Sequence, residues 1–116
     1  MTDACVVLCT APDPAVADTI ADRLLADRLA ACINVLPGVV SLYTWQGARC
    51  RDSECLLIIK TTAAAYPALE RTVTQIHPYE VPEILRLPVV DGWRAYLDWI
   101  SRSVAAPVAG TESPSG

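Results

Sequence analysis

The most chemically suggestive stretch of the sequence is the segment His77-Pro78-Tyr79-Glu80-Val81-Pro82-Glu83, which holds the only histidine of the chain. An imidazole can exchange protons near neutral pH or bind a metal ion. In an extended segment Glu80 and Glu83 differ in parity and point to opposite faces, so they do not predict a paired acid–base dyad. His77 has a second interpretation as the end of a helix, where an imidazolium suits the last carbonyl groups. Both interpretations stay open.

The five cysteines are Cys5, Cys9, Cys32, Cys50 and Cys55. Their odd number and apolar, strand-like contexts predict reduced thiols in a cytoplasmic protein. No CxxC pair is present, so the sequence of one chain shows no four-ligand zinc site. Cys9 is expected at the end of a strand, just before the positive end of a helix. That location favours a thiolate, and hence a nucleophile or a soft-metal ligand, with a buried core thiol as the alternative.

The sequence favours a binding protein over an enzyme. A hydrolase built on Cys9 and His77 would need a third group to orient the histidine, and none is evident. Serine-hydrolase, zinc-protease, phosphate-loop and dinucleotide motifs are also missing. The net charge of −4 and the single lysine give no electrostatic footprint for nucleic acid. Cations are the more natural partners of such a chain.

The hydrophobic periodicity predicts an α+β domain. Asp13 is expected to cap a first helix and Asp91 a last one, and Gln46-Gly47-Ala48 is a candidate hairpin turn. The predicted strands are 4–9, 32–36 continued by 39–45, 49–60 and 84–90, and the predicted helices are 14–30, 64–76 and 92–103. This order predicts a ferredoxin-like βαββαβ sandwich with an extra C-terminal helix.

The chain is also expected to bind copies of itself. It is 53% hydrophobic, compared with about 45–50% in typical globular proteins. The run Cys55–Ile59 is apolar on both faces of its strand, although both crossover helices should cover the same face. The uncovered face therefore predicts an interface. Tyr43 and Trp45, on a long hairpin strand, suit such a subunit interface.

The folded domain is expected to span residues 1–104, followed by a disordered tail over 105–116 that is rich in small and polar residues. Asp3 stands where a signal peptide would carry basic residues. The apolar runs are too short for a transmembrane helix. These features predict a cytoplasmic protein without membrane partners.

Several stretches together resemble the CutA family of divalent-cation tolerance proteins, in family order and over residues 5–100. They are Val7–Asp13, Leu29–Asn34, Pro37–Gly47, Leu57–Thr62, His77–Ile84 and Tyr96–Trp99. The resemblance implies a ferredoxin-like fold and a homotrimer that exchanges hairpins between subunits. It also implies similarity to the nitrogen-regulatory PII proteins, which leaves a sensor or adaptor for a small metabolite or partner protein as an alternative function.

The same resemblance implies a role in divalent-cation tolerance, with copper or another divalent cation bound near subunit interfaces. In some members copper is assigned to the cysteine at the position of Cys9 and to two adjacent histidines. His77 matches the second histidine, whereas Ile76 replaces the first and cannot ligate. Cys9 and His77 are therefore the candidate ligands, and a thiolate with an imidazole suits copper or zinc. The expected lining of the associated cleft is Tyr79, Glu80, Glu83 and Lys60.

Overall fold

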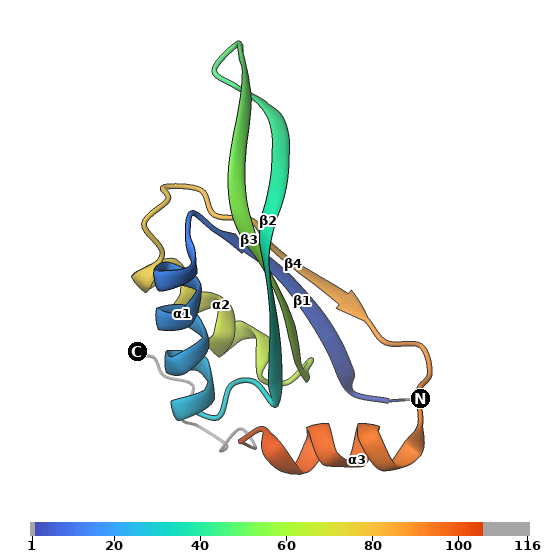
Figure 1. Ribbon diagram of the computed structural model, residues 1–116. Coiled ribbons are helices and arrows are strands. Elements are labelled where there is room, and N and C mark those ends of the chain that lie inside the picture. Colours follow the sequence, from blue (N-terminus) through green and yellow to red (C-terminus); the bar gives the residue numbers. More distant parts are fainter. Residues whose placement is uncertain (1, 106–116) are drawn as a thin grey trace.

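The computed structural model describes residues 2–105 as an α+β fold with four strands and three helices (Figure 1). The elements in chain order are β1 (Ala4–Ala11), α1 (Pro14–Ala26), β2 (Cys32–Trp45), β3 (Ala48–Thr62), α2 (Tyr66–Ile76), β4 (Ile84–Pro88) and α3 (Arg94–Ser103). The predicted order of strands and helices is confirmed. Of the predicted tail, residues 106–116 lie outside the described part of the chain.

The sheet has the strand order β2-β3-β1-β4, and all neighbouring strands are antiparallel. Each helix crossover therefore skips one strand: α1 joins β1 to β2 across β3, and α2 joins β3 to β4 across β1. This is the ferredoxin-like arrangement predicted from the sequence. Because β1 and β3 occupy the two central positions, the C-terminal end of β1 meets the middle of β3, with Ala11 opposite Cys55.

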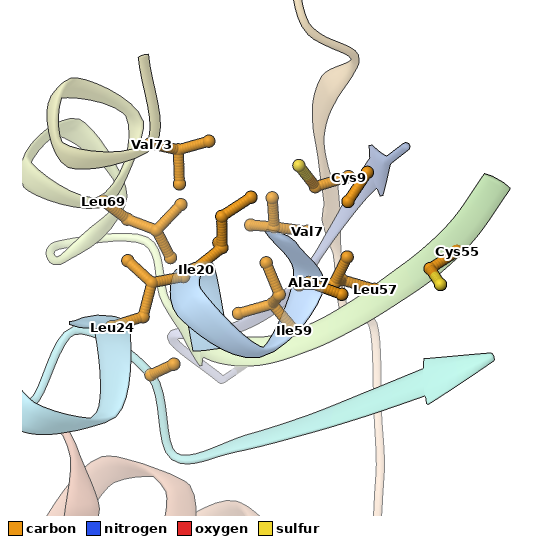
Figure 2. Close-up of a cluster of buried hydrophobic side chains, with 12 residues drawn as sticks. Val7, Cys9, Ala17, Ile20, Leu24, Cys55, Leu57, Ile59, Leu69 and Val73 are labelled. Carbon is orange, nitrogen blue, oxygen red and sulfur yellow. The ribbon is translucent and has the colours of Figure 1, made fainter. Parts of the chain in front are cut away.

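The core lies between the sheet and the two crossover helices (Figure 2). The apolar spacing of α1 places Ala17, Ile20 and Leu24 on one buried face. Alternate residues of the central strands point toward that face, because side chains alternate along a strand. Its members from the other elements are Val7, Cys9, Ala11, Cys55, Leu57, Ile59, Leu69 and Val73.

The opposite face of the sheet is apolar and incompletely covered. Leu8 lies between Ile58 of β3 and Leu85 of β4, and directly opposed residues share a face. Leu85 is 56% exposed and Leu87 is 45% exposed. Helix α3 lies across the end of the sheet where β1 starts and β3 ends, and its Ile100 packs with Ala4 and Ala65.

The long β2–β3 hairpin extends beyond every other element (Figure 1). A β-bulge between Leu36 and Val39 bends it, and Gly38 there takes a φ of +75°, which suits a residue without a Cβ. At the tip Trp45 pairs with Ala48, so Gln46 and Gly47 form a two-residue loop, both with positive φ. This is the geometry that matches the twist of a hairpin.

Two predicted helix boundaries were wrong. Helix α1 ends at Ala26, not at Ala30, because Arg28 takes a left-handed φ of 55° and turns the chain toward the sheet. There the backbone N–H of Ala31 donates to the carbonyl of Lys60. Asp91 does not cap α3: the helix starts at Arg94, and the Asp91 carboxylate accepts a bond from the neighbouring Gly92 N–H.

Candidate functional site

An open cleft of about 710 Å³ forms where the β2–β3 hairpin, the end of β1 and the segment after α2 meet. Its walls include aromatic side chains from the hairpin and from the segment 78–83. Its lining contains carboxylates and no lysine, arginine or histidine, so its electrostatic character is acidic. The carboxylates are Asp52, Glu54, Glu80 and Glu83, and the aromatic residues are Tyr43, Trp45 and Tyr79.

His77 is buried behind the cleft wall and is bonded through both ring nitrogens. Its Nε2 lies 2.7 Å from the carbonyl oxygen of Thr10, and its Nδ1 accepts the backbone N–H of Tyr79 at 3.1 Å. A carbonyl only accepts and an N–H only donates, so these partners define a neutral imidazole protonated at Nε2. His77 is therefore the C-cap of α2, and it ties β1 to the segment 78–83. Of the two interpretations of His77, the geometry favours the end of a helix.

Cys9 does not stand at an exposed strand end. Its side chain is fully buried in the core beneath the helices, and β1 continues to Ala11 (Figure 2). Burial, with smaller contributions from the charges of Glu83 and Glu54, raises the pKa of the Cys9 thiol to about 12. The expectation that this location favours a thiolate is therefore wrong. The thiol belongs instead to the same buried cluster as Ala17 and Ile20, on the helix that follows β1.

Cys9 and His77 as they stand do not fit a metal centre. The thiol is protonated, and the one lone pair of the neutral imidazole is already used by Tyr79. Within residues 2–105, no group of three or more histidine, cysteine, aspartate or glutamate side chains is placed to hold a metal ion. Resident zinc ions in proteins are held by three or four such ligands.

Lys60 lies away from the cleft. It sits on the open face of the sheet, opposite Val6 of β1, and its ammonium group contacts the side-chain oxygen of Asn34. Because strand residues rise about 3.3 Å each, Lys60 and Glu54 on the same strand are about 20 Å apart. The other three residues expected at the cleft, Tyr79, Glu80 and Glu83, do line it.

Two tyrosine–carboxylate pairs form the inner wall of the cleft. The hydroxyl of Tyr79 donates to Glu54 Oε2 at 2.7 Å, and the hydroxyl of Tyr43 donates to Asp52. Burial and the bond to Glu54 raise the pKa of Tyr79 far above its ordinary value. The bond to Asp52 raises the pKa of Tyr43 to about 12. Both phenols therefore stay protonated donors at neutral pH, and their rings are held in fixed positions.

Asp52 and Glu54 were missed in the sequence analysis. Glu54 is only 8% exposed, which is unusual for a carboxylate. The alternation of side chains along a strand could have revealed this pair, because Asp52 and Glu54 are two residues apart on one strand and so share a face. Glu54 also comes directly before the buried run Cys55–Ile59. What the sequence could not show is that Tyr79, 25 residues further on, reaches back to Glu54.

The architecture defines a ferredoxin-like α+β protein with an acidic cleft between the hairpin and the segment 78–83. Residues 5–103 match the CutA1 divalent ion tolerance protein family. The chain belongs to this family.

Similar proteins agree with that assignment. A protein of Thermus thermophilus named divalent-cation tolerance protein CutA is 53% identical over 95 residues, which are 82% of this chain and 92% of that protein. The solved structure of a divalent cation tolerance protein from Thermus thermophilus has a TM-score of 0.86 and 49% identity, and the match covers 88% of this chain and 99% of that one. A structure titled periplasmic divalent cation tolerance protein CutA, from Archaeoglobus fulgidus, has a TM-score of 0.85 and 33% identity, covering 88% and 99%.

None of the helices within residues 2–105 combines the length and the apolar character needed to cross a bilayer.

Proposed function

We propose that this protein is a non-enzymatic, self-associating protein of divalent-cation tolerance. Divalent cations bind at the carboxylates on the rim of the cleft. The observation that carries the proposal is the family match, taken with a cleft whose lining holds four carboxylates and no basic side chain. Asp52, Glu80 and Glu83 are exposed, and because Asp52 already accepts the Tyr43 hydroxyl, Glu80 and Glu83 are the rim carboxylates left for a cation. An uncompensated acidic cleft raises the local concentration of cations.

The chemistry of the rim favours weak, exchangeable binding. Carboxylate oxygens suit hard cations such as Mg²⁺ or Mn²⁺, whereas thiolates select Cu(I). A hydrated divalent cation that contacts one or two exposed carboxylates keeps most of its water. The protein would therefore respond to divalent cations at high concentration without holding one permanently, and copper is one candidate among several.

Isothermal titration with Cu²⁺, Zn²⁺ and Mn²⁺ tests the rim. The double variant Glu80→Gln/Glu83→Gln is expected to bind at least about tenfold more weakly, because charge-assisted contacts are the strong ones. His77→Gln is expected to bind like the wild type, since the imidazole offers no free lone pair. Glu70→Gln on α2 is the matched control for a lost surface charge. Unchanged metal affinity in the double variant would rule out the rim carboxylates as ligands. Weaker metal binding by His77→Gln would show that the imidazole is a ligand.

Self-association as a homotrimer is the second part of the proposal. The open sheet face and the hairpin together expose Leu36, Leu42, Tyr43, Trp45, Leu85 and Leu87, each by more than 40%. Exposed apolar surface on this scale is typical of interfaces. Light scattering after size exclusion should give three times the 12.5 kDa chain mass. A stable monomer would contradict it.

A second candidate function is that of a sensor or adaptor module that binds a small metabolite. The cleft volume of about 710 Å³ favours it, because small-molecule sites usually measure about 300–1,000 Å³. A thermal-shift screen of metals against metabolites separates the two functions, since each ligand stabilises only the state that it binds.

A cytoplasmic location is proposed for either function. Cell fractionation tests this location. The competing outcome is recovery of the protein from the periplasm, the location by which the Archaeoglobus fulgidus structure is described.

A further inference from the structure

We infer that the acidic cleft is completed by a second copy of this chain, whose hairpin sets a basic face against the acidic face of the first. The inference deepens the proposed self-association and rests on it. The outer hairpin is defined as residues 39–54, beyond the bulge. Its four charged side chains are Arg49, Arg51, Asp52 and Glu54.

The charges of the outer hairpin are sorted by sign onto its two faces. Side chains of one strand alternate between the faces, and directly opposed residues share a face. Asp52 and Glu54, two residues apart on β3, both line the cleft. Arg49 and Arg51 occupy the alternate positions of the same strand, and Arg51 lies opposite Leu42 of β2. One face is therefore acidic and the other is basic.

The charges on both faces lack an opposite charge within the described chain. The single salt bridge found within residues 2–105 joins Arg23 to Asp27 on α1. On the acidic face, the hydroxyl of Tyr43 donates to Oδ2 of Asp52. A neutral donor fixes that carboxylate without neutralising it, and the bond leaves the second oxygen for another donor. Asp52 is exposed, whereas Glu54 is buried, so Asp52 is the expected contact.

The two faces also match in apolar content and in spacing. On the basic face Val40 is 48% exposed and Leu42 is 61% exposed, and on the acidic face Trp45 is 46% exposed. The two arginines are two residues apart, as are the two carboxylates, so each pair spans about 7 Å. Arginine suits an interfacial carboxylate, because its planar fork donates two parallel hydrogen bonds. A basic face laid on an acidic face thus pairs charges and buries apolar surface in one contact.

A second copy of this chain is the partner that carries the matching face. The contact is heterologous, because two different faces meet, so each copy uses one face toward each of its two neighbours. Heterologous contacts close into a ring when the rotation between copies allows it, and three copies close such a ring in the proposed homotrimer. The acidic face is also continuous with the open apolar face of the sheet, since Leu56 and Ile58 follow Glu54 at alternate positions of β3.

The partner's arginines leave the metal proposal intact. The cleft lining holds four carboxylates, and two arginines can balance two of them. The rim carboxylates Glu80 and Glu83 lie on the segment after α2 and not on the hairpin, so they keep their charge for a cation. The completed cleft then has a neutralised inner part and an acidic rim.

Charge reversal on each face tests the inference by light scattering after size exclusion. Arg49→Glu/Arg51→Glu and Asp52→Arg each set like charges against one another, which opposes the contact. Each variant should keep the wild-type circular dichroism spectrum and lose the trimer mass at a concentration at which the wild type holds it. Arg71→Glu on α2 and Asp18→Arg on α1 are the matched controls, because both residues are exposed on helices, and both variants should stay trimeric.

A mixture of the two reversed variants distinguishes two different faces from one self-complementary patch. The Arg49→Glu/Arg51→Glu chain keeps its acidic face and the Asp52→Arg chain keeps its basic face, so one intact contact can form between them. The mixture should therefore give a species of twice the 12.5 kDa chain mass that neither variant gives alone. Trimer mass in either variant by itself, or no heavier species in the mixture, would overturn the inference.

A conservative variant covers the case in which a reversed variant does not fold. Arg51→Lys keeps the charge and supplies an amine, which a water-soluble carbodiimide couples to a carboxylate in contact with it. We expect a covalent link between position 51 of one subunit and Asp52 or Glu54 of another, in a band of twice the chain mass, and no link at position 71 in Arg71→Lys. Absence of the first link overturns the inference. A monomeric wild type would contradict self-association as well, whereas a trimer with none of these effects would contradict only the pairing of the faces.

Discussion

The two halves of the long β2–β3 ribbon have opposite environments. On the body side of the bulge, Leu57 and Ile59 are fully buried beneath α1 and α2. On the far side, Leu42 is 61% exposed and Trp45 is 46% exposed, with no helix over them. The same two strands pair in both halves, on either side of the bulge between Leu36 and Val39. The body therefore obtains its stability within one chain, whereas the hairpin leaves its apolar side chains exposed, and an isolated two-stranded ribbon is only marginally stable.

The largest effect expected in the body concerns Cys9 at alkaline pH. Its pKa lies at about 12 rather than 9.0, which corresponds to about 4 kcal/mol at 1.36 kcal/mol per pKa unit. Below pH 9 both the folded and unfolded states keep the proton, so this contribution is fully present. As the pH rises toward 12 the unfolded state loses its proton first, and the free energy of unfolding falls.

Urea unfolding between pH 8 and 11 measures this dependence. Cys9→Ala removes the titrating group, so its free energy of unfolding should fall less steeply with pH than that of the wild type. Parallel pH profiles for the two proteins would show that Cys9 is not buried as described.

The second prediction compares one leucine from each half. Leu24→Ala, in the fully buried core, should lower the free energy of unfolding by about 3 kcal/mol, from lost burial and the cavity left behind. Leu42→Ala, in the hairpin, should change the folding stability of the monomer by less than about 0.5 kcal/mol. Urea titrations below the association concentration check both. Similar losses in the free energy of unfolding at the two positions would mean that the two halves of the ribbon do not differ in burial.

The third prediction concerns His77 at the end of β1, where Thr10 pairs with Leu56 beside the bulge. His77→Ala leaves the Thr10 carbonyl and the Tyr79 N–H without their partner, and an unsatisfied buried group costs about 1–3 kcal/mol. We expect a loss of about 2 kcal/mol in urea unfolding. His77→Gln should recover part of it, because an amide can both donate and accept. No loss in the alanine variant would show that the imidazole does not tie β1 to the segment 78–83.

The smallest effect on folding, and the largest on assembly, is expected at the hairpin. Leu42→Glu places a charge on its exposed apolar face. The variant should keep the wild-type circular dichroism spectrum but lose the trimer mass in light scattering. Its melting temperature should then no longer depend on protein concentration, as expected for a chain that no longer associates. A full trimer mass in this variant would exclude the hairpin from the interface.

Much of the fold could be predicted from local patterns. The hairpin turn predicted at Gln46-Gly47-Ala48 and the Asp13 cap of α1 follow from residue types and spacing alone, and both are confirmed, although Ala48 is already the first residue of β3. The end of α1 could not be found in this way, because Arg28 has no glycine-like signal for its left-handed backbone. It turns there because Leu29 and Ala31 must reach the sheet. The site was predicted in part: Tyr79, Glu80 and Glu83 line the cleft, and Asp52 and Glu54 were not foreseen.

The sequence by itself determined which elements form and in what order, because periods of 2 and 3.6 residues are local properties of strands and helices. It also determined the family. Only the tertiary structure decided which side chains meet. The ring of His77 bonds to Thr10, 67 residues earlier, and Tyr79 bonds to Glu54, 25 residues earlier. Such contacts depend on the register of β1 against β3 and on where the segment after α2 crosses the strand ends. For the same reason Cys9 became a core thiol, and Glu54 became the buried charge of the cleft.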